Sequence, residues 1–310
     1  MNVIFHHTAG QDLTARLHAL PGLRIAICPE DDDALLKSLL PECDVLWHVL
    51  KRCTADMIAR APRLKLIQKI GVGVNTIDLE AAKQRGIPVC NLPGTNARAV
   101  AELTVTLMLA VLRRLPRFDS GLRGGTWTDP VLQDGIGELS GRVVGLIGYG
   151  AIPRILAPIL TAFGCQVLFT ARRTVPDAVG TQVSLPDLLA RSDIVSLHVP
   201  QTEETTGMID AGALARMKPG AILINTARGG LVDRPALVAA LLSGQLAGAG
   251  LDVFDAEPIA AGDPVLSLPN VVVTPHIGWV TTGTFDRSFV VAAENCRRLE
   301  AGEPLLHRVV

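Results

Sequence analysis

Aromatic side chains are scarce in this 310-residue chain: Phe, Trp and Tyr together make up 4%, against 48% for all hydrophobic residues. The core is therefore expected to consist mainly of Ala, Leu, Val and Ile. Long apolar runs are absent as well. The run Leu103–Leu112 is too short to span a bilayer and ends in two arginines, so we expect no membrane partner.

Neither sign of charge is in excess, since 29 Lys and Arg face 30 Asp and Glu. Without a basic stripe or a polybasic run, the sequence argues against nucleic acid or an anionic membrane as partner. The segment Met1–Phe5 resembles a first strand and not a signal peptide. A cytoplasmic enzyme or binding protein is the class that fits.

The six cysteines include no CxxC pair, and most lie in or beside apolar runs. Reduced core thiols are therefore expected in place of disulfides, and no metal site is predicted. The positions are Cys28, Cys43, Cys53, Cys90, Cys165 and Cys296.

Strand and helix patterns alternate with short links, which predicts an α/β fold of two doubly wound parallel sheets. The first set of strands is predicted at Asn2–His6, Arg24–Cys28, Asp44–Val49, Leu64–Ile70 and Pro88–Asn91. The helices between them are predicted at Asp12–Leu20, Asp31–Leu40, Thr54–Ala61 and Asp78–Gly86, where each first residue is suited to cap or open its helix. A long helix at Thr95–Arg114 and a polar, glycine-rich passage from Arg117 to Gly141 follow.

A second α/β unit begins at Arg142, and the chain ends in a helix at Thr282–Ala301. The strands of this unit are predicted at Val143–Gly148, Gln166–Thr170, Ile194–Val199, Ala221–Asn225, Gly248–Phe254 and Val271–Thr274.

Three of these strands run into chemically competent side chains, namely Arg228, Glu257 and His276. Because ligands bind outside the carboxyl ends of parallel strands, one sheet edge could gather all three. A guanidinium that grips an anion and an acid-held imidazole that moves a proton form a plausible catalytic set. Each also has a structural interpretation: an ion pair for Arg228, a helix-start carboxylate for Glu257 and a hydrogen-bonded core histidine for His276.

A glycine turn follows the first strand of the second unit. Gly148 permits the turn, Gly150 lets the backbone approach a pyrophosphate, and the amides of Ala151 and Ile152 are available to phosphates. Pro153 stands where a third glycine normally allows close helix–strand packing, so slightly splayed packing is expected. The strand, turn and helix together predict a dinucleotide site.

The end of the next strand bears on the choice of cofactor. An NAD site usually has Asp or Glu about 20 residues beyond the turn. Here the strand ends in Thr170, Ala171, Arg172 and Arg173, without a carboxylate. Two guanidiniums and a hydroxyl suit a 2′-phosphate, which favours NADP over NAD. The alternative is that both arginines are solvated surface charges.

Several ordered motifs resemble the D-isomer-specific 2-hydroxyacid dehydrogenase family, in particular its glyoxylate and hydroxypyruvate reductases. They are Gly148-Tyr-Gly-Ala-Ile, Ser196-Leu-His-Val-Pro200, Lys218-Pro-Gly, Asn225-Thr-Ala-Arg-Gly-Gly230, Asp252-Val-Phe-Asp-Ala-Glu-Pro258 and Thr274-Pro-His-Ile-Gly278, with Gly71-Val-Gly-Val-Asn75, Asp78, Asn96 and Ala101-Glu102 in the first half. The resemblance covers nearly the whole chain.

The family implies a discontinuous, flavodoxin-like substrate domain of residues 1–97 and 283–310. A Rossmann domain that binds NAD(P), residues 98–282, is inserted into it. The helix at Thr95–Arg114 would lie at the hinge and at the surface of a homodimer.

The resemblance also implies roles for the site residues. Arg228 would bind the substrate carboxylate, His276 would protonate the 2-oxo oxygen, and Glu257 would orient the imidazole and favour its charged form. The amides of Val72 and Gly73 would complete the carboxylate clamp. Residues lining the cofactor would include Val199, Pro200, Thr205, Ala227, Asp252 and Gly278, in addition to those of the glycine turn and the arginine pair.

The implied activity is reduction of a small 2-oxo acid, such as glyoxylate or hydroxypyruvate, to the D-2-hydroxy acid. The alternatives are an NAD-dependent dehydrogenase of D-3-phosphoglycerate or a bulkier 2-hydroxyacid, and a non-catalytic dinucleotide sensor resembling a corepressor. Trp279 stands where a small residue is common and is expected to narrow the pocket. Lys51 and Lys69 are expected to be solvated, with contact to the substrate as the alternative, and His198 is expected to be structural.

Overall fold

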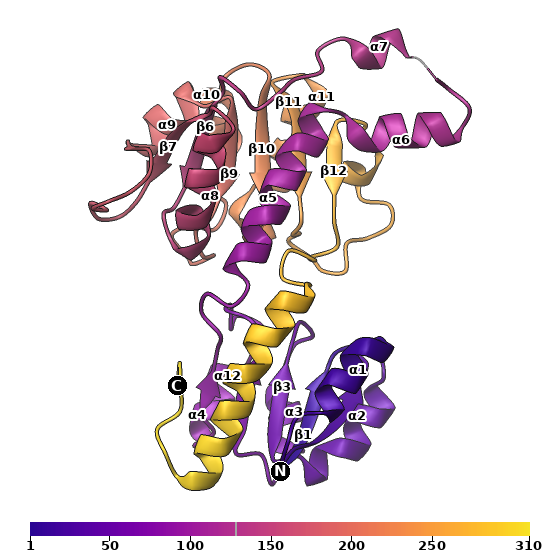
Figure 1. The fold of residues 1–310 in the computed structure, drawn as a ribbon, viewed down its shortest axis with the longest axis vertical. Helices are drawn as coiled ribbons and strands as arrows, with labels where there is room; N and C mark the ends of the chain where they lie inside the picture. The colour runs from indigo at the N-terminus through magenta and orange to yellow at the C-terminus, as the bar shows by residue number, and fades with distance from the viewer. Residues whose placement is uncertain (128) are drawn as a thin grey trace. The chain divides into compact units, whose positions relative to one another are not determined.

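The computed structural model describes residues 1–127 and 129–310, which form two compact units. One unit combines Met1–Asn96 with Thr281–Val310, and the other is Ala97–Val280. Each contains one sheet whose strands all pair in parallel, so the predicted α/β fold of two parallel sheets is confirmed. Figure 1 shows the ribbon of both units.

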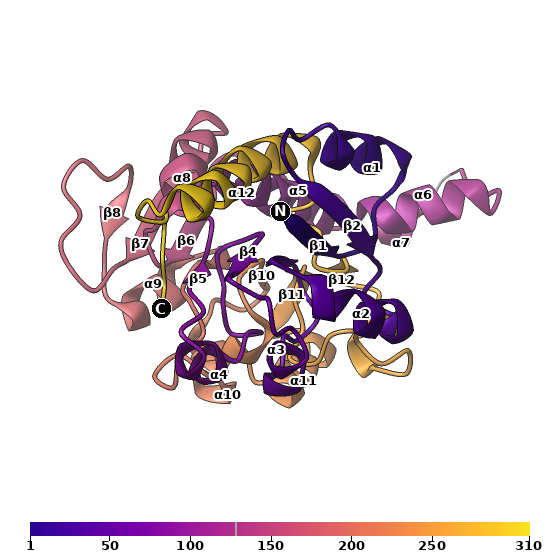
Figure 2. The same cartoon turned by 90° about the horizontal axis from the view of Figure 1, so that it is seen from below.

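The first unit holds a five-stranded sheet with the order β2-β1-β3-β4-β5, which is the doubly wound order of flavodoxin-like folds. Figure 2 shows α1 and α12 on one side of this sheet and α2, α3 and α4 on the other. The strands are β1 (Asn2–His6), β2 (Arg24–Cys28), β3 (Val45–His48), β4 (Leu66–Lys69) and β5 (Val89–Cys90). The helices are α1 (Gln11–His18), α2 (Asp33–Leu39), α3 (Ala55–Ala59), α4 (Leu79–Gln84) and α12 (Thr282–Ala301), with the 3₁₀ turn η1 at Leu40–Glu42.

Side-chain caps set the start of four of these helices, including α12, which is capped by Thr281. Thr54 and Asp78 accept hydrogen bonds from the amides of the third residue beyond them, as their positions predict. The cap of α2 is Asp32 and not Asp31, while α1 follows Gly10 and has Asp12 in its first turn. The prediction was therefore wrong by one residue at Asp31.

The last helix joins the two ends of the chain into one core. Phe289 of α12 stacks on Trp47 of β3 with the ring centroids 5.7 Å apart, and Phe5 of β1 meets it edge-on at 6.1 Å. Such aromatic pairs add to the free energy of burial. Phe285 of α12 stacks on Phe289 as well, so four of the eleven aromatic residues of the chain lie where α12 covers the first sheet.

The second unit holds a seven-stranded sheet with the order β12-β11-β10-β9-β6-β7-β8. Numbered from β6 and read from the opposite edge, this is the 3-2-1-4-5-6 order of dinucleotide-binding folds with one strand added. The strands are β6 (Val143–Ile147), β7 (Gln166–Thr170), β8 (Thr181–Gln182), β9 (Ile194–Leu197), β10 (Ala221–Asn225), β11 (Leu246–Leu251) and β12 (Val271–Val273).

Helices cover both faces of this sheet, as Figure 1 shows for α5 and α8 on one face. That face is covered by α5 (Ala97–Leu112) and α8 (Ala151–Ala162), and the other by α9 (Leu185–Arg191), α10 (Ala211–Arg216) and α11 (Arg234–Leu242). Although α5 is apolar, no helix within residues 1–127 or 129–310 combines the length and hydrophobicity needed to cross a bilayer.

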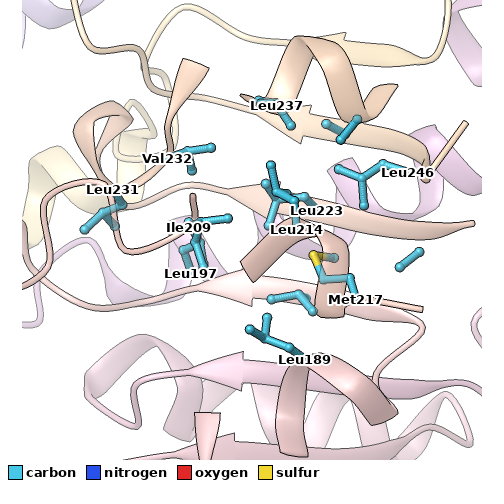
Figure 3. Close-up of a cluster of buried hydrophobic side chains, with 14 of the residues drawn as sticks. Leu189, Leu197, Ile209, Leu214, Met217, Leu223, Leu231, Val232, Leu237 and Leu246 are labelled. Atoms are coloured by element: carbon cyan, nitrogen blue, oxygen red, sulfur yellow. The ribbon is translucent and has the colours of Figure 1, made fainter. Parts of the chain in front are cut away.

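The period of two along the buried strands divides the core between the faces. Ile222 and Ile224 of β10 pack with α5 and α8, whereas Leu223 between them packs with α9, α10 and α11. Figure 3 shows the second of these clusters, where Leu223 lies among Leu214, Leu237 and Leu246. The core is aliphatic there, as the composition predicts.

The polar, glycine-rich passage that precedes the second sheet contains helices that the sequence did not predict. The helices α6 (Leu115–Arg123) and α7 (Pro130–Gln133) lie within or beside the passage from Arg117 to Gly141, although Thr128 is outside the described residues. The edge strand β8 and the 3₁₀ turns η2 (Gly229–Leu231) and η3 (Pro264–Ser267) are further additions.

All six cysteines are buried and free, which confirms the prediction of reduced core thiols. Burial raises the pKa of the Cys43 and Cys53 thiols to about 12. Thiolates are therefore disfavoured at these positions, and the side chains act as small apolar groups.

Candidate active site

Neighbouring parallel strands bring the three predicted residues together. In the sheet β11 lies between β10 and β12, with Asn225 opposite Leu251 and Leu251 opposite Val273. Because the carboxyl ends of these strands are in register, the segments that carry Arg228, Glu257 and His276 leave the sheet side by side.

The turn that carries Arg228 is built on a buried amide. The Asn225 side chain donates to the Arg228 carbonyl at 2.8 Å and accepts from the Ala227 amide at 3.0 Å. Thr226 is held by the Thr104 hydroxyl of α5 at 3.0 Å. A guanidinium N–H donates to the Ala227 carbonyl at 2.6 Å, so the Arg228 side chain folds back over its own turn.

Gly229 allows the next segment to come close. A Cβ atom at this position would lie 1.9 Å from the carbonyl carbon of Phe254 and 2.2 Å from the Asp255 amide nitrogen. Only a residue without a side chain fits such an approach. The contact brings the Arg228 turn against the segment that leads to Glu257.

Glu257 holds the imidazole of His276. Its Oε2 lies 2.6 Å from Nδ1 of the ring, while its Oε1 accepts the Phe254 amide at 2.9 Å. Nε2 of His276 has no hydrogen-bond partner among the described residues. The ring is therefore fixed through one nitrogen and leaves the other to a ligand.

The charges of the three side chains support one another. Burial acts to raise the pKa of Glu257, but the hydrogen bond and charge of His276, the Phe254 amide and Arg228 outweigh it and lower that pKa. Burial lowers the pKa of Arg228, and the charge of Glu257 opposes this effect. A half-buried carboxylate thus lies beside a guanidinium and an imidazole, as expected for a site that binds an anion and moves a proton.

Asp252 organises the backbone around His276. Its carboxylate accepts the Thr274 hydroxyl at 2.6 Å and the Ile277 and Gly278 amides at 2.8 and 2.9 Å. The His276 amide also donates to the Asp252 carbonyl at 2.8 Å. These bonds hold His276 at a φ of 55°, a left-handed conformation uncommon for residues other than glycine.

The sequence did not predict that the Asp252 side chain would hold the loop that carries His276. The motif suggested only a position beside the nicotinamide, whereas the side chain is 1% exposed and both oxygens are engaged within the protein. Burial raises the pKa of Asp252 despite the three donors. The position of Asp252 in an apolar run could have indicated this role, because a buried carboxylate requires several hydrogen-bond donors.

Arg234 anchors the Glu257 segment from α11 and was also missed. Its guanidinium pairs with Asp255 and, at 2.9 Å, with Asp263, and it lies 5.4 Å from the centre of the Phe254 ring. The segment between β11 and η3 is thereby fixed on both sides of Glu257.

The glycine turn lies where the strand order reverses, between β6 and β9, the usual ligand position in such sheets. Gly148 has a φ of 98°, and a Cβ there would meet the His198 carbonyl oxygen at 2.8 Å. Gly150 is in open space and precedes α8, whose first turn has no side-chain cap in the described chain. The amides of Ala151 and Ile152 in that turn suit phosphate oxygens. Pro153 is buried inside a continuous α8.

The arginine pair lies just beyond β7. Arg172 and Arg173 are exposed and make no ion pair with the described residues. The Thr170 hydroxyl accepts the Gly148 amide at 3.2 Å, which ties the end of β7 to the glycine turn.

The other predicted cofactor residues surround the ends of β9, β10 and β12. The Thr205 hydroxyl donates to the Pro200 carbonyl at 2.7 Å, and Val199 lies against Gly148. Ala227 and Gly278 belong to the two loops described above. His198 bonds Ser196 at 2.9 Å, and burial lowers its pKa to about 3, in keeping with a structural histidine.

The first unit carries the remaining predictions. Val72 and Gly73 follow β4, and their amides donate no hydrogen bond within the described chain. Lys69 is 6% exposed and donates to the Val49 carbonyl, so the expectation of a solvated lysine was wrong. Lys51 is partly exposed but pairs with Asp33 at 2.5 Å. Both lysines satisfy backbone or acidic groups at the carboxyl edge of the first sheet.

Comparison with known proteins agrees with this geometry. Residues 105–278 match the family model described as the NAD binding domain of D-isomer specific 2-hydroxyacid dehydrogenases. The chain belongs to this family. The match lies within the second unit and includes the glycine turn, Arg228, Glu257 and His276. The chain thus carries the family's dinucleotide-binding domain.

Two curated relatives and one solved structure illustrate the similarity. The chain is 41% identical over 280 residues to D-3-phosphoglycerate dehydrogenase of Mycobacterium tuberculosis, covering 88% of this chain and 52% of that protein. It is 42% identical over 252 residues to hydroxypyruvate reductase of Thermotoga maritima, covering 80% and 81%. The crystal structure of TT0316 protein from Thermus thermophilus is 40% identical with a TM-score of 0.89, and the alignment covers 100% of both chains. The chain spans about half the length of the phosphoglycerate dehydrogenases it matches.

Proposed function

We propose that this protein reduces a small 2-oxo acid to the D-2-hydroxy acid with a nicotinamide cofactor. The observation that carries the proposal is the assembly of Arg228, Glu257 and His276 at the ends of three neighbouring strands. Membership of the family and the similarity to a hydroxypyruvate reductase support the same reaction.

Arg228 is the proposed anchor of the substrate carboxylate. A guanidinium offers paired donors to a carboxylate and also stabilises the charge that grows on the 2-oxo oxygen. Its own turn is fixed by Asn225, so the side chain is held ready for an anion. The backbone amides of Val72 and Gly73 are the proposed substrate contacts of the first unit.

His276 is the proposed acid. A bound nicotinamide would supply the hydride for the carbonyl carbon, and Nε2 of His276 would deliver a proton to the 2-oxo oxygen. Glu257 on Nδ1 keeps the ring oriented and stabilises its charged form. In the reverse direction the neutral ring accepts the proton at the same nitrogen.

For the cofactor, we propose that Gly148, Gly150, Ala151 and Ile152 hold the pyrophosphate. The open space at Gly150 and the uncapped first turn of α8 fit that group. Further residues proposed to line the cofactor are Thr170, Val199, Pro200, Thr205, Ala227, Asp252 and Gly278. Asp252 would act indirectly, through the loop that its carboxylate holds.

The proposed preference is for NADP. Arg172 and Arg173 are exposed at the end of β7, where an NAD site normally has a carboxylate. The test compares kcat/KM for NADPH and NADH in the wild type and in the double variant Arg172→Ala, Arg173→Ala. The preference should fall by ~10-fold or more, since each lost charge-assisted bond is worth about 1.5–3 kcal/mol. An unchanged preference would contradict the assignment.

The substrate is tested by a panel of 2-oxo acids with both cofactors. Glyoxylate and hydroxypyruvate are the first choices, with D-glycerate for the reverse direction. D-3-Phosphoglycerate with NAD belongs in the panel, because phosphoglycerate dehydrogenases are among the relatives at about 41% identity. Turnover of a 2-oxo acid supports the proposed reaction. Binding of NADPH without turnover of any of them would favour a dinucleotide sensor instead.

We also propose that the protein forms a homodimer. Several apolar side chains are exposed in the chain segment that leads from α5 to β6, and a cavity of about 670 Å³ beside them is lined by residues such as Leu109, Leu115 and Phe118. Exposed apolar groups gathered in one region are typical of contact surfaces. The exposed residues are Leu115, Leu122, Trp127, Val131 and Ile136.

A further inference from the structure

The loop from Ala171 to Gly180 carries Arg172 and Arg173 and connects β7 to the short edge strand β8. Exposed arginines on a free loop would have to be ordered whenever an anion binds, and that ordering costs affinity. In this chain two side chains hold the loop, and neither belongs to the residues assigned to the cofactor so far.

Gln182 of β8 holds the half of the loop that carries the arginines. Its Nε2 donates to the carbonyls of Ala171 and Arg173 at 3.2 and 3.1 Å, and its Oε1 accepts the Val175 amide at 3.3 Å. One side chain thus bonds the backbone before, at and after the arginine pair.

Tyr149 holds the other half. Its hydroxyl donates to the Val179 carbonyl at 3.0 Å and accepts the Val179 amide at 2.8 Å. The ring is 8% exposed and packs on Phe169 of β7 with centroids 4.1 Å apart. The next residue, Gly180, has a φ of 108° and lies on the Val167 backbone, where a Cβ would meet the carbonyl oxygen at 2.7 Å. The loop therefore returns to the sheet at a fixed point.

The position of Tyr149 connects the loop to the phosphate site. Tyr149 stands between Gly148 and Gly150, the two glycines of the turn, and is the only tyrosine of the chain. The Gly148 amide donates to Thr170 at the end of β7, so turn and loop are joined at two points. A nearby guanidinium, that of Arg154 in α8, lies 5.5 Å from the centre of the Tyr149 ring.

We propose that Tyr149 and Gln182 are positioning residues for cofactor choice: they preform the loop Ala171–Gly180 so that Arg172 and Arg173 meet a 2′-phosphate without prior ordering. The inference rests on the proposed preference for NADP. The selectivity for the phosphorylated ribose then comes from a loop held in place as well as from the two charges.

Binding of two fragments isolates the 2′-phosphate from the rest of the cofactor. Adenosine 2′,5′-bisphosphate and adenosine 5′-monophosphate differ only in that group, and calorimetry measures their affinities without catalysis. The variants are Tyr149→Phe, which removes the hydroxyl and keeps the ring, and Gln182→Met, which keeps the length and removes the bonds. The matched control is Gln166→Met, at the exposed opposite end of β7.

Each of the two variants should weaken the bisphosphate by ~3- to 10-fold and leave the monophosphate unchanged, while Gln166→Met changes neither. In steady-state kinetics the KM for NADPH should rise by a similar factor, with kcat and the KM for NADH unaltered. Equal weakening of both fragments, or a bisphosphate affinity like that of the control, would overturn the positioning role of Tyr149 and Gln182 but not the proposed preference for NADP. A wild type that does not prefer the bisphosphate would overturn the NADP preference and this inference with it.

Discussion

Two carboxylates act on His276 in different ways. Glu257 bonds the ring at Nδ1, while Asp252 binds the hydroxyl and amides of the loop that carries the ring. The first interaction fixes the orientation of the imidazole. The second holds a backbone conformation with positive φ. The sequence motif contains both acids but does not distinguish their contacts.

The Glu257–His276 pair predicts a defect in kcat. In Glu257→Gln the amide can still accept the Nδ1 proton but no longer stabilises a charged ring, so kcat should fall by ~10²-fold with little change in the KM for the 2-oxo acid. Steady-state kinetics measure both constants. Glu80→Gln, at an exposed position of α4, serves as the control and should behave as wild type. A drop confined to KM would contradict the proposed role of Glu257.

Two buried histidines predict a loss of stability in mild acid. Burial lowers the pKa of His48 and of His198 to about 3, below the unfolded value of 6.5. Between these values the unfolded chain binds more protons than the folded one, so the free energy of unfolding falls as pH decreases from 6.5 toward 3. Each histidine should contribute a loss of about 1 kcal/mol between pH 6.5 and 5.5.

Urea denaturation at several pH values measures this effect. In the double variant His48→Gln, His198→Gln the dependence between pH 7 and 5.5 should be shallower than in the wild type, whatever the absolute stability of the variant. Equal slopes for the two proteins would show that these histidines are not buried in their neutral form.

At the level of elements, strands with a clear apolar pattern were predictable from the sequence. β1, β2, β7 and β10 begin and end at the predicted residues, as does α12. β8 was not predicted, because its two residues become a strand only through pairing with β7. α6 carries Leu115, Phe118 and Leu122 on one face, but Pro116 and Gly121 interrupt the helical pattern in the sequence, and none of its residues is buried. The burial of Lys69 depends on a carbonyl twenty residues away in sequence, which no local pattern reports.

Close packing of η2 on the end of β11 predicts the effect of a small substitution. Gly229→Ala places a methyl group at 1.9 Å from the Phe254 carbonyl carbon, so the Arg228 turn must move away from Glu257. The variant should lose at least ~2 kcal/mol of stability and most of its kcat/KM. Thermal unfolding and kinetics test this, with Gly262→Ala as control because nothing lies within 4 Å of that position. Retention of full activity by Gly229→Ala would argue against the close approach.

For the whole molecule, the periodicity of the sequence predicted two α/β sheets, and the resemblance to the dehydrogenase family implied that the last helix returns to the first of them. The contact surface of an oligomer was harder to predict from the sequence. The exposed apolar residues around α6 lie in a polar, glycine-rich stretch, and their exposure is known only from the fold. The family resemblance implies a dimer surface at the helix Thr95–Arg114, and the proposed surface adds exposed side chains of α6 and α7, which follow this helix in the chain.

This surface predicts a change in oligomeric state. Leu122 is 55% exposed on α6, and Leu122→Asp should weaken a dimer by placing an uncompensated charge in the contact. Sedimentation velocity at several protein concentrations measures the change. Leu242→Asp, at a 70% exposed leucine of α11, is the matched control and should leave the dimer intact. A monomeric wild type, or equal effects of both variants, would refute the assignment of this surface.

The central claim is that His276 donates the proton in the reduction of a 2-oxo acid. The most direct test measures NADPH oxidation with the best substrate of the panel in wild type and His276→Ala, together with NADPH affinity by fluorescence. We predict that kcat of the variant falls by at least ~10²-fold while its affinity for NADPH is unchanged. Turnover at the wild-type rate by His276→Ala would contradict the account.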